Sequence, residues 1–150
     1  MAESARALLL ATITEWTKFA NERDRFRNIA NEVSMVTRSI IKDHLSIFLA
    51  KKIDVSCESA DDLRILGTKI SVEPIIEETY PTVKASVALK CGGAARSILI
   101  NSNGSISAGG PPFMFDELKK GVPESFVANA AEFVRDAFLN VARTGSNPAR

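Results

Sequence analysis

The N-terminal third of the chain contains no residue that breaks a helix. The first glycine is Gly67 and the first proline is Pro74. Glycine and proline are the two residue types that disfavour a helix interior most strongly, so their absence over such a span favours helix. Apolar residues also recur there at helical spacing. They are Leu9, Ile13, Trp16 and Ala20.

A second apolar series follows a polar stretch at residues 21–25. Its members stand mostly three and four residues apart, which is typical of the seam of a packed helix. They are Phe26, Ile29, Val33, Val36, Ile40 and Ile47. A seam of this kind is buried either inside the chain or against a second copy, so these residues are candidates for an interaction surface.

The length of this helical region raises a geometric problem. One unbroken helix from Ser4 to Ala50 would be about 68 Å long, whereas a compact domain of this chain length is only about 38 Å across. Either the helix overhangs the domain and packs against a partner subunit, or the chain turns. The polar stretch favours a turn or kink at Asn21–Asp24, where Asn21 and Asp24 can cap a second helix.

Alternating apolar and polar residues then predict an antiparallel β-meander of four to five strands. The clearest strand is Thr82–Cys91, and Gly92-Gly93 and Asn103-Gly104 are hairpin signals. The expected strands cover residues 52–58, 63–76 (one strand or a strand pair), 82–91, 94–101 and 105–107, with a turn at 77–81. Polar residues alternate with the apolar ones along these strands and lie on one face of the sheet. We expect that face to meet water or a partner.

A final helix is predicted after Pro123, a residue suited to the first helical position. Its broad apolar stripe includes Phe126, Phe133 and Phe138 and is wide enough to cover a sheet face. We therefore predict an α+β fold over residues 1–143, forming one domain. It has an N-terminal helical segment (one long kinked helix or two helices), the meander, and a C-terminal helix packed on the sheet. Residues 144–150 are predicted to be a flexible tail.

The charge distribution excludes few classes of protein, but it disfavours binding to nucleic acid. Lysine and arginine number 19 against 18 acidic residues, and the two signs interleave along the chain, whereas nucleic-acid binders concentrate basic residues. The one basic neighbourhood is a candidate contact for an anion or an acidic partner, or else a solvated helix surface balanced by nearby carboxylates. It contains Arg23, Arg25, Arg27 and Arg38.

Cys57 and Cys91 both lie on the apolar side of an alternating pattern. This favours two buried thiols in a reducing compartment, and hence a cytoplasmic protein. Whether the two residues are close in space stays open. The longest early apolar run, Leu8–Ala11, is too short to span a membrane.

No catalytic, metal or nucleotide motif is present. His44 is the only histidine and has no ligand or nucleophile beside it in a recognised spacing. The acidic pairs Asp61-Asp62 and Glu77-Glu78 lack the alternating ligands of a calcium loop. We therefore expect no cofactor, and an enzyme is not favoured.

An aromatic segment follows the rigid Pro111-Pro112. Phe113, Met114 and Phe115 are either a contact element or a plug for the end of the sheet.

These patterns favour a non-enzymatic protein–protein interaction domain, such as an adaptor, a chaperone or an immunity or regulatory subunit. We expect it to associate with itself, as a dimer or higher oligomer, through the N-terminal helices, and with another protein. The alternative is a small-ligand-binding protein or an enzyme, with an apolar pocket between the sheet and the helices. Its candidate lining includes Phe113, Phe115, Phe133 and Phe138.

Overall fold

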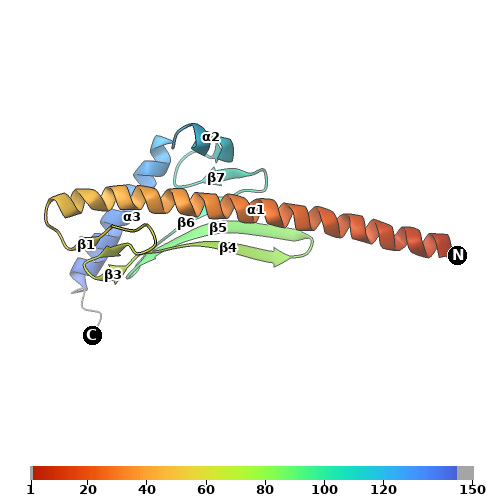
Figure 1. The fold of residues 1–150 in the computed structure, drawn as a ribbon, viewed down its shortest axis with the longest axis horizontal. Helices are drawn as coiled ribbons and strands as arrows, with labels where there is room; N and C mark the ends of the chain where they lie inside the picture. The colour runs from red at the N-terminus through yellow and green to blue at the C-terminus, as the bar shows by residue number, and fades with distance from the viewer. Residues whose placement is uncertain (1, 145–150) are drawn as a thin grey trace.

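The computed structural model describes residues 2–144 and confirms the α+β class (Figure 1). A long N-terminal helix is followed by antiparallel strands and a C-terminal helix that packs on the sheet. The tail predicted over residues 144–150 lies outside the described residues, apart from Thr144. That residue follows the last helix and donates its backbone N–H to the carbonyl of Asn140.

The N-terminal helix α1 (Ala2–Ala50) is continuous. The turn predicted at Asn21–Asp24, and with it the second helix, is therefore wrong. Polar residues in a stretch without glycine or proline cost a helix little, and Arg23 lies 3.9 Å from Glu78 of the neighbouring strand. At 1.5 Å per residue, α1 is about 73 Å long, so it overhangs the rest of the molecule (Figure 1).

The main sheet is a five-stranded meander in sequence order. Its strands are β4 (Ser71–Thr79), β5 (Thr82–Cys91), β6 (Ala94–Ile100), β7 (Ser105–Ser107) and β8 (Phe113–Met114). The predicted strand Thr82–Cys91 and the hairpins at Gly92-Gly93 and Asn103-Gly104 are confirmed.

The β4–β5 hairpin is longer than the sequence predicted. The expected turn at 77–81 is shortened to Tyr80-Pro81, because Glu77 and Glu78 pair with Lys84 and Val83 in the ladder. The hairpin therefore reaches further along α1 than expected.

A small three-stranded sheet precedes the meander. It consists of β1 (Val55–Ser56), β2 (Arg64–Ile65) and β3 (Thr68–Lys69). The strand predicted over 52–58 is thus reduced to two residues. Gly67 forms the β2–β3 turn with a φ of 83°, a left-handed conformation that glycine adopts without strain.

Both long helices lie on the same face of the main sheet. The helix α1 packs on β4 and β5, while α3 (Glu124–Arg143) packs on β6, β5 and α1. The short α2 (Phe115–Lys120) joins β8 to α3. The inward side chains of β5, Ala85, Val87 and Leu89, are buried, whereas the outward Lys84 and Lys90 are exposed. The result is a two-layer arrangement with one open sheet face.

Within residues 2–144, no helix combines the length and apolar character needed to cross a membrane.

Candidate functional site

The N-terminal end of α1 is the most exposed part of the described chain. We call residues 2–18 the overhang: all of their side chains are exposed, and most of the segment extends past the tip of the β4–β5 hairpin (Figure 1). Five large apolar side chains lie there. They are Leu8 (68% exposed), Leu9 (62%), Leu10 (52%), Ile13 (58%) and Trp16 (50%). Exposed apolar patches are typical of interaction sites, so the overhang is the candidate site.

The apolar stripe of the overhang continues the face by which α1 packs on the sheet. Phe19, Phe26, Val33 and Ile40 stand seven residues apart and are all buried. Continuing N-terminally in steps of seven leads to Thr12 and Ala5, beside which Leu9 and Trp16 lie on the same helical face. The helix thus carries one seam, which is covered over residues 19–45, the docked segment, and exposed in the overhang.

An aromatic cluster forms where the overhang meets the sheet. The ring centroids of Trp16 and Phe19 are 5.2 Å apart, those of Phe19 and Tyr80 5.2 Å, and those of Trp16 and Tyr80 5.8 Å. The Tyr80 hydroxyl also donates to Glu15 Oε2 at 3.4 Å. Tyr80 sits at the tip of the β4–β5 hairpin, so the cluster marks the limit of the sheet's cover on α1.

The seam residues predicted to mediate interaction are mostly inside the molecule. Phe26, Ile29, Val33 and Ile40 are buried in the core, and Val36 is partly buried against it. Only Ile47 is exposed, at 63%. The chain's own sheet and C-terminal helix cover the seam, so most of these residues are not accessible to a partner.

The four arginines of the basic neighbourhood do not gather into one patch. Arg27 Nη2 lies 2.8 Å from Glu78 Oε1, and Arg23 Nε lies 3.9 Å from the same oxygen. Arg25 pairs with Glu22 at 3.2 Å. Arg38 donates to the carbonyl of Val72 at 2.5 Å, and its Nη1 lies 3.7 Å from Asp61 Oδ1. Three of the four therefore tie α1 to the elements beneath it, and all four pair with carboxylates of the chain itself, as on a helix surface balanced by nearby acidic residues.

The aromatic segment at 113–115 divides between core and surface. Phe113 is buried and meets Phe126 edge to face at 5.8 Å, as a plug would. Phe115 is partly buried and lies 5.3 Å from the Lys119 ammonium, whereas Met114 is exposed. Phe133, another residue of the expected ligand pocket, is fully buried in the same core.

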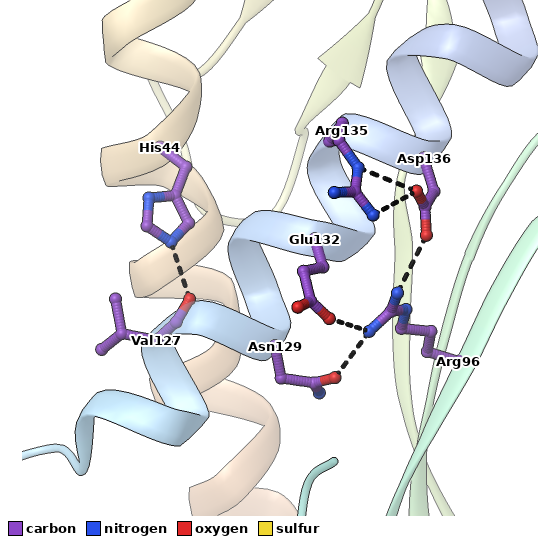
Figure 2. Close-up of polar contacts among 7 residues, drawn as sticks. All are labelled: His44, Arg96, Val127, Asn129, Glu132, Arg135 and Asp136. Carbon is purple, nitrogen blue, oxygen red and sulfur yellow. Dashed lines mark hydrogen bonds and ion pairs between the residues drawn. The ribbon is translucent and has the colours of Figure 1, made fainter. Parts of the chain in front are cut away.

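A polar cluster joins β6 to α3 (Figure 2). Arg96 donates to Asn129 Oδ1 at 2.8 Å, to Glu132 Oε2 at 3.0 Å and to Asp136 Oδ2 at 2.9 Å. Arg135 donates to the other Asp136 oxygen. Hydrogen bonds from Arg96 and then Arg135 hold the pKa of the Asp136 carboxyl below its usual value. Each partner is another side chain of the cluster, so the arrangement is a clamp between helix and sheet.

The remaining candidates for chemistry are also used structurally. His44 places Nε2 3.2 Å from the carbonyl of Val127, linking α1 to α3 (Figure 2). Cys57 and Cys91 are free and buried, as predicted, and burial raises the pKa of Cys91 to about 11. That thiol stays protonated near neutral pH and is a poor nucleophile. Among the described residues, no group of three or more His, Cys, Asp or Glu is placed to hold a metal ion.

Comparison with known proteins adds no functional information. No family model matches the chain, and searches of curated proteins and of solved structures return no significant similarity. The overhang is therefore the candidate functional site. The spacing of Leu9, Ile13 and Trp16 already indicated an apolar face, but only the position of the sheet shows that nothing in the described chain covers it.

Proposed function

We propose that this protein is a non-enzymatic protein–protein interaction domain that associates with itself through the overhang. The observation that carries the proposal is the set of five large apolar side chains, each at least half exposed, on residues 8–16. The proposal includes a role as an adaptor, a chaperone or an immunity or regulatory subunit, together with a further protein partner and the cytoplasmic location expected from the sequence. Its first partner is a second copy of the chain.

Covering the apolar face of the overhang also stabilises its helical conformation. Isolated helices of about 12–15 residues are marginal in water even when rich in alanine. Here three threonines, Thr12, Thr14 and Thr17, donate their hydroxyls to the carbonyls four residues before them, at 2.8–2.9 Å. Such bonds destabilise a helix slightly. Packing against another apolar surface offsets this weakness, because most helix stability in proteins comes from packing of the apolar face.

A second copy can cover the seam of the overhang. Full burial of a large apolar side chain contributes roughly 1.5–3 kcal/mol. Leu9, Ile13 and Trp16 lie on or beside the seam and are at least half exposed, so six such side chains in a dimer contribute roughly 4–9 kcal/mol in total. Association costs an estimated 4–15 kcal/mol, so we expect a weak, reversible dimer.

Light scattering over a concentration series tests the proposal. We expect the wild-type chain to shift from monomer to dimer as its concentration rises through the micromolar range. The variant Leu9→Glu/Ile13→Glu places charges in the seam and is expected to stay monomeric, because a charge at an apolar interface loses its hydration without gaining a partner.

The matched control is Met35→Glu, since Met35 is 62% exposed on the same helix but lies outside the overhang. This variant should associate like the wild type, and circular dichroism should show all three proteins folded. A wild-type chain that stays monomeric at several hundred micromolar would rule out self-association.

A further inference from the structure

We infer that the second copy docks on the overhang in the antiparallel direction, so that Ala5 of one copy faces Trp16 of the other. In the same register, Leu9 faces Thr12. This inference rests on the proposed function, because it specifies the partner and the geometry of that same surface. It follows from the course of the seam and from side-chain sizes.

The course of the seam excludes a parallel partner on this face. The face that is exposed at Leu9 and Trp16 is the face that the sheet covers from Phe19 onward. A parallel second helix in contact with Leu9 would continue along α1 into the β4–β5 hairpin, whose Tyr80 already contacts Phe19. An antiparallel helix runs the other way, so the body of the second copy lies beyond the N-terminal end of the first (Figure 1).

The antiparallel register also matches large side chains with small ones. Trp16 faces Ala5, whereas a parallel in-register pair would stack Trp16 on Trp16 and Ala5 on Ala5. Facing layers of large and small residues interdigitate at native density, while layers of equal residues leave the helix separation uneven. The register also places the first turn of each copy against the half-exposed Trp16 and Tyr80 of the other.

Disulfide trapping in the full-length chain distinguishes the two directions. A disulfide requires Cα atoms within about 7 Å. With Ala5→Cys and Trp16→Cys mixed and oxidised, the antiparallel register predicts a mixed disulfide between the two variants. Ala5→Cys alone should give almost none, because the two copies of residue 5 are then about 16 Å apart along the axis. The wild type is the control for Cys57 and Cys91, which are buried.

A second measurement avoids altering Trp16. Spin labels on Ala5→Cys are expected about 20 Å apart in the antiparallel dimer, against about 10 Å in a parallel one, from the helix rise and the separation of packed helices. A dimer that shows the short distance, or that links Ala5→Cys to itself, overturns the antiparallel register but leaves self-association standing. A dimer that forms neither cross-link and holds the spin labels much farther apart has its contact elsewhere in the molecule. That result also overturns the antiparallel register. A monomeric wild type overturns both proposals.

Discussion

The overhang and the docked segment are two parts of one helix with the same seam and different surroundings. In the docked segment, Phe26, Val33 and Ile40 are buried under the chain's own sheet. In the overhang, Leu9 and Trp16 continue the seam and remain at least half exposed. The comparison shows that an apolar stripe indicates which face of a helix is covered, while the lengths of the other elements determine what covers it. Here the β4–β5 hairpin ends at Tyr80, and the intramolecular cover ends with it.

The largest expected effect comes from truncating one apolar side chain in each part. Phe26→Ala removes a ring that is 4% exposed and should lower the free energy of unfolding by about 3–5 kcal/mol. Leu9→Ala, measured at concentrations where the chain is monomeric, should change it by no more than about 0.5 kcal/mol. Urea unfolding provides both values. Similar losses for the two variants would mean that the overhang is packed within the monomer, contrary to the comparison.

Amide hydrogen exchange sharpens the comparison along α1. In the monomeric variant Leu9→Glu/Ile13→Glu, amides of the overhang should open with a free energy near zero, whereas those of the docked segment should approach the global stability. At high concentration, the wild-type overhang should gain protection through association. Met35→Glu should follow the wild type. Equal protection of the overhang in the monomeric variant and in the associated wild type would count against packing by a second copy.

The smallest effect concerns the way α3 is held, by a polar clamp as well as by apolar packing. Hydrogen bonds from Arg96 and Arg135 lower the pKa of Asp136 in the folded state. The stability from this carboxylate is therefore fully present above its unfolded pKa of about 4 and is lost as the pH falls through the lower folded value. We expect melting temperatures, measured between pH 7 and pH 2, to be higher for the wild type than for Asp136→Asn at neutral pH.

That difference should shrink below pH 4, because the protonated carboxyl then resembles the amide. Asp43→Asn, an exposed substitution on α1, is the control and should keep a constant offset from the wild type. A constant offset for Asp136→Asn as well would show that the clamp contributes no charge-dependent stability.

Much of the fold could be predicted from the sequence because it depends on local preferences. Gly92-Gly93 and Asn103-Gly104 favour tight turns whatever surrounds them, and both hairpins formed as expected. The alternation of Thr82–Cys91 specified a strand with one buried face. The candidate site was harder to predict. The heptad spacing of Phe26–Ile47 suggested an intermolecular seam, but the same spacing serves equally well for packing on a sheet.

The sequence by itself determined the helical character of the first third, the main strands, the two hairpins and the apolar face of α1. Backbone preferences and side-chain periodicity are properties of neighbouring residues, so they can be read without the fold. Only the tertiary structure decided that α1 is unbroken at Asn21–Asp24 and that its cover stops at the Tyr80 hairpin. Both outcomes depend on contacts between distant residues, such as that of Arg27 with Glu78. Those contacts end at the hairpin, and the N-terminal end of the seam stays exposed.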